Sequence, residues 1–414
     1  MQIKRSLYLD QLIRKKNNGL IKIVTGIRRC GKSYLLFTLF YQHLLECGVD
    51  EDHIICLALD DLKNDKYTNA VTLYDYILST KKDDNKYYIL LDEIQLVADF
   101  EKVLNGLLRY SNFDIYVTGS NSKFLSSDII TEVRGRGDEI RVYPLSFSVY
   151  FSAVDMSFDR AWQDYIIYGG MPLILSQPTD SDKTRYLSNL VNQVYLSDII
   201  NRHHLRGLEE VGELMNIIAS NIGALTNPKR IANTFQSESK LKLTQTTIST
   251  YLDYFIDSFI IQKAFRYDIK GNKYINTPLK YYFIDMGIRN ARLNFRQNEE
   301  THLMENVIYN ELIIRGYSVD VGVIDRTIKT KENKYQRTLY EVDFVANKGS
   351  KRIYIQSALS LSDPEKMKQE QRSILSINDA FEKILIQRNY CKTWYTENGI
   401  KVMCLENFLL SQEI

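Results

Sequence analysis

The stretch that decides the fold is GIRRCGKS, residues 26–33, which fits the pattern GxxxxGK[ST] at every fixed position. A short apolar, β-branched run, residues 21–25, precedes it, and a helix-like stretch, residues 34–45, follows. Strand, glycine-rich loop and helix in this order are the context that a phosphate-binding loop requires. This context disfavours the alternative, a tight strand–helix turn that binds nothing.

The chemistry of a polyphosphate explains the spacing of this motif. Two glycines let the backbone wrap closely around an anionic chain, and inward-pointing amides at a helix N-terminus favour negative charge. Lys32 would place its ammonium between the β- and γ-phosphates, and Ser33 would offer its hydroxyl to Mg²⁺. The residues expected to bind ATP or ADP are Gly26, Arg29, Cys30, Gly31, Lys32, Ser33 and Tyr34.

A second apolar run, residues 87–91, ends in Asp92 and Glu93. Beside the phosphate loop, Asp92 at the tip of a buried strand would complete the Mg²⁺ shell. Glu93 has the length to polarise a water molecule as general base. The adjacent glutamate favours ATP hydrolysis over a GTPase-type switch or a small-molecule kinase.

Two weaker signals follow along the chain. A third strand-like run, residues 115–118, leads to Ser120 and Asn121, of which either could sense the γ-phosphate or simply cap a turn. Arg136 lies in an Arg-Gly-Arg-Gly stretch and could stabilise transition-state charge, within the chain or from a neighbouring copy; a solvated surface loop is the alternative.

The remaining chain divides by changes of pattern into three further segments. We expect an α/β core with a parallel sheet over 1–150, a helical lid or linker over 151–225, a winged helix over 226–292 and a second α/β unit over 293–414. The winged-helix outline rests on helices at 228–235 and 244–254, followed by strands at 260–267 and 280–284 around a Lys-Gly-Asn turn.

Composition limits the partners and the compartment. The chain has 414 residues with 53 Lys and Arg against 51 Asp and Glu, so any nucleic-acid surface must be local. Residues 225–292 carry 11 basic and 5 acidic side chains, an excess of six, which permits contact with double-stranded DNA but equally allows protein docking. Five scattered cysteines and the lack of a signal peptide or apolar membrane span favour a cytoplasmic protein without membrane contact.

An ordered series of motifs resembles one prokaryotic family of AAA-type P-loop ATPases, with an AAA_14-like core and a C-terminal DUF4143, restriction-endonuclease-like domain. The motifs are VTGIRRCGKS, YYILLDEIQ, YVTGSNS, the stretch from Gly135 to Phe147, YGGMP at 168–172, YYFIDMG at 281–287 and YEVDFV at 340–345. The resemblance implies that Ser120 or Asn121 is the sensor and Arg136 the catalytic arginine. It also implies that Arg5 and Tyr8 pass near the adenine base.

The endonuclease-like fold places an acid on a helix, then Asp, then Glu-x-Lys on the next strand, where they bind Mg²⁺. By this resemblance the matching positions are Glu305, Asp343 and Gln356. Ala358 stands where the fold has lysine, and this departure argues against cleavage of DNA.

Three functions therefore remain open on the sequence. The first is a Mg²⁺-dependent ATPase, a switch or motor coupled to DNA through the winged helix. The second is a nucleotide-gated scaffold that docks a protein or a second copy of the chain, and the third is a DNA nuclease. The oligomeric state is not determined by the sequence.

Overall fold

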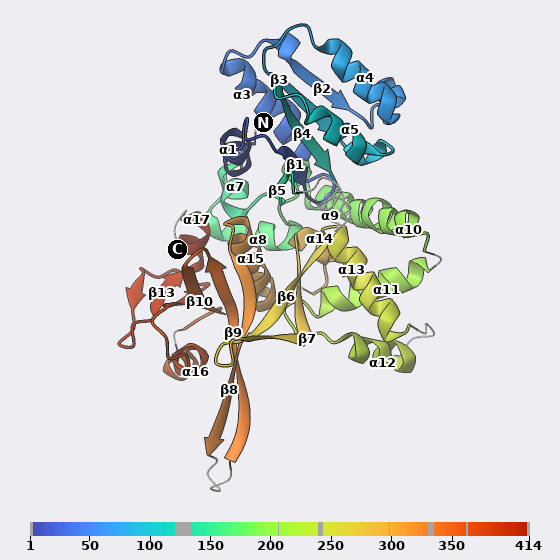
Figure 1. Cartoon of the computed structure of the whole chain (residues 1–414). Coiled ribbons are helices and arrows are strands. Elements are labelled where there is room, and N and C mark those ends of the chain that lie inside the picture. Colours follow the sequence, from blue (N-terminus) through green and yellow to red (C-terminus); the bar gives the residue numbers. More distant parts are fainter. Residues whose placement is uncertain are drawn as a thin grey trace. The chain divides into compact units, whose positions relative to one another are not determined.

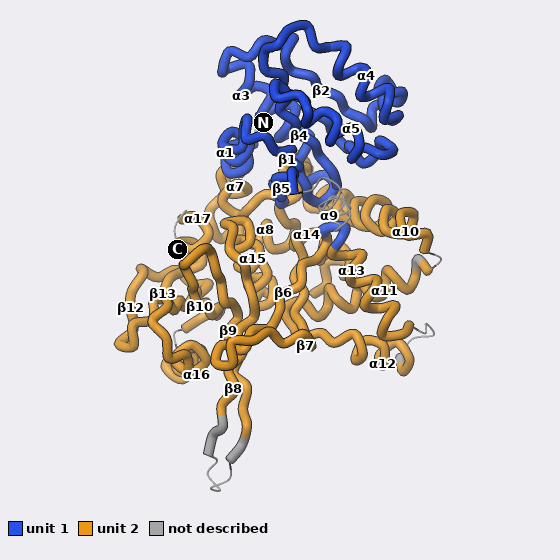
Figure 2. The backbone as a smooth tube through the Cα atoms, viewed as in Figure 1, with its two compact units in different colours: residues 1–144, 257–259 blue, residues 145–256, 260–414 orange. Residues whose placement is uncertain are grey.

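The computed structural model describes residues 3–120, 135–205, 207–238, 243–297, 299–329, 335–361 and 363–411. The chain divides into two compact units (Figure 2): unit 1 comprises residues 1–144 and 257–259, and unit 2 comprises residues 145–256 and 260–414. The first boundary lies six residues before the predicted end of the core at residue 150. Among the described residues, no helix combines the length and the apolar character needed to cross a bilayer.

Unit 1 is built on a five-stranded parallel sheet of order β2-β3-β4-β1-β5 (Figure 1). Every residue of β1, β3 and β4 is buried, which explains why these strands are continuous apolar runs in the sequence. The strands are β1 (Ile21–Thr25), β2 (Ile54–Ala58), β3 (Tyr87–Asp92), β4 (Phe113–Gly119) and β5 (Gly137–Arg141). The predicted α/β core with a parallel sheet is thus confirmed.

Helices connect these strands and cover the sheet. They are α1 (Ser6–Arg14), α2 (Lys32–Tyr34), η1 (Leu35–Phe40), α3 (Tyr41–Glu46), η2 (Glu51–His53), η3 (Leu62–Thr68), α4 (Ala70–Thr80), η4 (Ile94–Leu96) and α5 (Phe100–Leu107). The interior of unit 1 also contains a buried ion pair. Lys22 on β1 donates to Asp114 on β4, and Tyr116 donates to the other oxygen of that carboxylate at 2.8 Å.

The helices of unit 2 come mainly before and between its strands. They are α7 (Phe147–Ser152), α8 (Phe158–Tyr168), η6 (Pro172–Ser176), α9 (Asp180–Asn189), η7 (Leu190–Leu196), α10 (Ser197–His203), α11 (Leu208–Ser220), α12 (Pro228–Glu238), α13 (Gln245–Asp257), α14 (Met286–Arg292), α15 (Glu300–Ile314), α16 (Pro364–Leu375) and α17 (Leu405–Leu410). The two helices predicted for the winged-helix segment correspond to α12 and α13.

A single eight-stranded sheet runs through unit 2, in the order β12-β13-β11-β10-β9-β8-β6-β7. Its strands are β6 (Ile261–Asp268), β7 (Lys273–Phe283), β8 (Ser318–Lys329), β9 (Tyr335–Lys348), β10 (Lys351–Ala358), β11 (Glu382–Gln387), β12 (Trp394–Tyr395) and β13 (Lys401–Cys404). The expected wing hairpin, β6–β7, pairs through β6 with β8, so it belongs to the same sheet as the strands of 293–414. The domain boundary expected at residue 292 therefore falls within one continuous sheet. The reason is that β6 pairs with β8, which lies about 55 residues further along the chain.

Two of the quoted motifs interlock inside unit 2. Asp285, which begins α14 as its N-cap, accepts a hydrogen bond from the Gly170 amide at 2.6 Å and from the Ile288 amide at 3.1 Å. Gly169 lies so close that a Cβ there would stand 2.1 Å from the Asp285 carboxylate. YGGMP and YYFIDMG are thus two halves of one buried junction.

Candidate nucleotide site

The glycine-rich loop leaves the carboxyl end of β1, between β4 and β5, where parallel sheets place their ligands. Gly26 has φ +144°, and a Cβ on it would stand 2.2 Å from the Val142 carbonyl oxygen. Gly31 has φ +98° and immediately precedes α2. Both glycines are therefore needed by the backbone, as a phosphate loop requires.

Lys32 opens the helical run that follows the loop. Its side chain is buried, and its ammonium donates to the carbonyls of Gly26 at 3.0 Å and Ile27 at 3.3 Å. The ammonium therefore lies beside the first two residues of the loop. Cys30 is fully buried and contacts the Val142 carbonyl through its sulfur, so it contributes backbone rather than a reactive thiol.

Asp92 ends β3 beside this loop and is only 4% exposed. Burial raises the pKa of its carboxyl, while hydrogen bonds from the Ser33 and Thr118 hydroxyls oppose that rise. The carboxylate thus stands against the hydroxyl of Ser33, and together they present two oxygen ligands of the type that Mg²⁺ prefers. These residues fit the magnesium ion that the sequence predicts.

Glu93 follows in a left-handed conformation with φ +53°, which turns its side chain out of the strand direction. Its amide donates to Thr118 Oγ1 at 2.9 Å. Ser120, buried after β4, donates to Glu93 Oε2 at 3.2 Å, and Gln95 donates to the same oxygen. The structure thus brings the predicted base and Ser120 together, whereas Asn121 lies outside the described residues.

Thr118 and Gln95 were not identified from the sequence. Thr118 bridges the two acidic residues, since its hydroxyl donates to Asp92 and accepts from the amide of Glu93. Its position at the end of a strand neighbouring β3 was the available signal, because parallel strands bring their carboxyl ends to one edge.

Arg5 and Tyr8, expected near the adenine, are both buried in unit 1. Arg5 donates to the carbonyls of Cys30 and Tyr143, and Tyr8 Oη accepts from the Tyr143 amide at 3.2 Å. Burial raises the pKa of the Tyr8 phenol, which stays neutral. These side chains brace the back of the phosphate loop, and neither is solvent-exposed for stacking on a base.

Arg136 is exposed and lies at the opposite edge of the sheet. Its carbonyl accepts from the amide of Ile21, the first residue of β1, whereas the phosphate loop follows the last. Four strand steps of about 3.3 Å separate these levels, roughly 13 Å along the sheet. The backbone of Arg136 therefore lies just before β5, at the end of the sheet away from the carboxyl end of β1 that carries the phosphate loop.

The residues matched to a nuclease also come together in unit 2. Asp343 on β9 accepts from Gln356 Nε2 at 3.0 Å, and its other oxygen accepts from the Ser357 amide at 2.9 Å and hydroxyl at 2.7 Å. Glu305 on α15 accepts from Lys280 at 3.0 Å and from Tyr282 at 2.6 Å. Within the described part of the chain, no group of three His, Cys, Asp or Glu side chains has an arrangement that could hold a metal ion.

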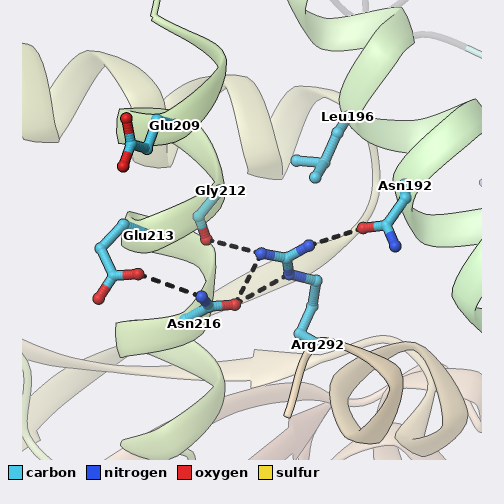
Figure 3. Close-up of a pocket in the computed structure, with 7 residues that line it drawn as sticks. All are labelled: Asn192, Leu196, Glu209, Gly212, Glu213, Asn216 and Arg292. Carbon is cyan, nitrogen blue, oxygen red and sulfur yellow. Dashed lines mark hydrogen bonds between the residues drawn. The ribbon is translucent and has the colours of Figure 1, made fainter. Parts of the chain in front are cut away.

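A pocket of about 390 Å³ lies between helices of unit 2 (Figure 3). Its lining comprises Asn192, Leu196, Glu209, Gly212, Glu213, Asn216 and Arg292. The Arg292 guanidinium donates to Asn192 at 2.8 Å, to Asn216 at 2.7 and 3.0 Å, and to the Gly212 carbonyl at 3.0 Å. The guanidinium therefore ties three helical segments together and is engaged by the protein itself.

Sequence comparison matches residues 18–151 to a family model, AAA_14, described as AAA domain. This range includes the phosphate loop, Asp92, Glu93 and Ser120. Together with the parallel sheet it makes the amino-terminal unit an AAA-type P-loop ATPase domain. Residues 159–299 match a second model, described as Domain of unknown function (DUF8612). The expected DUF4143 and endonuclease-like assignments are not confirmed.

A relative from Haemophilus influenzae, described as an uncharacterized protein, is 33% identical over 415 residues, covering 99% of this chain and 98% of the relative. The chain belongs to the same family. A second member, an uncharacterized protein of Methanocaldococcus jannaschii, is 28% identical over 406 residues, covering 94% of this chain and 85% of that protein. Both alignments therefore span nearly the whole of this chain.

Two solved structures are similar at lower levels. Cdc6p from Pyrobaculum aerophilum has a TM-score of 0.30 and 13% identity, covering 63% of this chain and 89% of that chain. The Orc1 protein of Aeropyrum pernix, solved in complex with DNA, has a TM-score of 0.30 and 11% identity, covering 70% of this chain and 92% of that chain. At these scores neither likeness carries an argument about this chain.

Proposed function

We propose that this protein is a Mg²⁺-dependent ATPase in which hydrolysis drives a switch or motor. The proposal rests on one arrangement of side chains. The Ser33 hydroxyl donates to the buried carboxylate of Asp92, and Ser120 holds the neighbouring carboxylate of Glu93. A magnesium ion held by Ser33 and Asp92 would neutralise charge on the phosphates.

The chain's own residues divide the remaining work. The loop amides and the Lys32 ammonium bind the phosphates, and Glu93 takes a proton from the attacking water. The hydrogen bond from Ser120 to Glu93 Oε2 orients this carboxylate and would respond to the state of the phosphates. These roles are those that a switch with a sensed γ-phosphate needs.

The test compares three single variants with wild type in ATP binding and ATP turnover. Lys32→Ala should lose ATP binding, while Glu93→Gln should keep it and lose turnover by a factor of about 100 or more. Lys63→Ala, an exposed lysine of the same unit, is the matched control and should retain both. Unchanged ATP affinity in Lys32→Ala would reject the site.

We further propose that Arg136 acts on the nucleotide of a neighbouring copy. Its exposure and its place at the edge remote from its own phosphate loop support this arrangement. Mixing Arg136→Ala with Lys32→Ala protein decides the question. Activity above the sum of the two variants is expected, since each copy supplies what the other lacks. Mixing without any gain would contradict an arginine acting between copies.

The proposed coupling to DNA rests on the exposed cations of residues 225–292, because Arg266, Lys280 and Arg289 of this segment are buried. Among the described residues the exposed cations are Lys229, Arg230, Lys263, Lys270 and Lys273. Thr244 immediately precedes α13 and Gln245 begins it, both with exposed side chains. Lys270 lies in the β6–β7 turn and Lys273 begins β7. Such donors suit phosphate oxygens. The measurement is the ATPase rate with and without duplex DNA at low and moderate salt. Stimulation that fades with salt supports DNA as the partner, and an unchanged rate favours a protein-docking role.

A further inference from the structure

A lysine, Lys280, lies in the acidic cluster of unit 2, which comprises Glu305, Glu341, Asp343 and Gln356. This lysine is not one of the positions matched to the endonuclease-like fold. Lys280 lies on β7, an edge strand of the sheet that pairs with β6. It is therefore not on β10, the strand that carries Gln356 and Ala358. It is 4% exposed, and its ammonium lies 3.0 Å from Glu305 Oε1 and 2.8 Å from Glu341 Oε1. Two carboxylates from different elements therefore share one internal cation.

Several oxygen atoms of the cluster also accept hydrogen bonds from protein donors. Tyr282 donates to the Glu305 oxygen that Lys280 contacts. Both oxygens of Asp343 accept from Gln356 and Ser357. The Gln356 carbonyl oxygen, the atom that could bind a metal, accepts from the Asp343 amide at 3.3 Å and from Ser373 at 3.4 Å. A divalent ion would have to displace several protein donors at once.

Lys280 supplies a positive charge between the Glu305 and Glu341 carboxylates and offsets part of their negative charge. Ala358, at the position of the expected lysine, packs in the apolar core under α16.

We infer that the ammonium of Lys280 takes the place of a divalent cation in this cluster. The cluster then resembles a nuclease centre but binds no metal ion and does not cleave DNA. The cluster then serves to join β7, α15 and β9, the elements that carry Lys280, Glu305 and Glu341. A buried charge with good partners stabilises only while all partners remain. This inference does not depend on the ATPase activity.

The inference predicts that removing the lysine creates a metal site. The experiment measures thermal unfolding of the nucleotide-free full chain with and without Mn²⁺, followed by tryptophan fluorescence, because both tryptophans, Trp162 and Trp394, lie in unit 2. Lys280→Ala should lower Tm, and Mn²⁺ should restore roughly 2–5 °C of it. Lys280→Gln, a milder variant, should gain the same response if the alanine variant fails to fold.

Asp343→Asn in the wild-type background is the control for metal bound elsewhere. Wild type and Asp343→Asn should respond equally to Mn²⁺, and neither should cleave plasmid with Mn²⁺ and ATP. Wild-type stabilisation by Mn²⁺ that Asp343→Asn removes would overturn the inference. So would plasmid cleavage that this substitution removes, or folded lysine variants that gain no response to Mn²⁺.

Discussion

The junction at Asp285 offers the sharpest quantitative test of the structure. Its carboxylate is 3% exposed and accepts backbone hydrogen bonds from Gly170, Gly287 and Ile288. Burial raises its pKa from 3.8 to about 6 against these hydrogen bonds. At ~1.4 kcal/mol per pH unit, this shift corresponds to ~3 kcal/mol of stability that depends on pH.

The sign follows from proton binding. Between pH 4 and 6 the folded state keeps a proton on Asp285 that the unfolded chain has released, so the free energy of unfolding falls as pH rises through this window. Asp285→Asn cannot titrate and offers one acceptor oxygen instead of two. Leaving one buried amide without a partner costs about 1–3 kcal/mol. The penalty of Asp285→Asn should therefore be greatest near pH 4 and shrink by ~3 kcal/mol towards pH 8.

Urea unfolding followed by tryptophan fluorescence at a series of pH values measures this difference, since both tryptophans report on unit 2. The matched control is Asp363→Asn, which removes an exposed N-cap carboxylate from α16 and should cost about 1 kcal/mol or less. A penalty for Asp285→Asn that stays constant across the pH range would refute the buried junction.

Three further predictions concern unit 1. Gly26→Ala should weaken ATP binding and destabilise the unit by about 2 kcal/mol or more, measured by ATP titration and thermal unfolding, because the new Cβ meets a carbonyl at 2.2 Å. Ser120→Ala should lower the turnover rate about tenfold with little change in ATP affinity, since Glu93 loses one of its orienting hydrogen bonds. Lys22→Met should cost about 3–5 kcal/mol in urea unfolding because it leaves Asp114 buried without its cation, and Lys22→Met with Asp114→Leu should recover most of that loss.

Each of these has a result that would contradict it. Gly19→Ala is the control for Gly26→Ala, because Gly19 also has a positive φ but has open space around an added Cβ. An equal loss of ATP binding and stability in Gly19→Ala would remove the steric argument for Gly26. An increase in the ATP dissociation constant without a slower turnover would exclude an orienting role for Ser120. A double variant as unstable as Lys22→Met would show that the buried ion pair is not the source of the cost.

Local sequence was enough to predict much of unit 1. The strand 21–25, the glycine-rich loop and the acids after residue 91 are each encoded within about a dozen consecutive residues, because buried parallel strands are apolar runs and phosphate loops need glycine. Ser120 was also within reach, since parallel strands deliver their ends to one edge. Arg136 was not, because its level on the sheet depends on the pairing of β5 with β1.

The amino-acid sequence by itself determined that unit 1 has a phosphate loop on a parallel sheet, with Asp92 and Glu93 at its edge. Only the tertiary structure decided that β6–β7 joins the sheet of residues 318–404, that Lys280 meets Glu305 and Glu341, and that Asp285 meets Gly170. The reason is that strand pairing and buried charge pairing join residues up to about 115 positions apart. No periodicity or spacing in a local window specifies such partners, whereas burial makes each unpaired donor or charge costly and so fixes them in the fold.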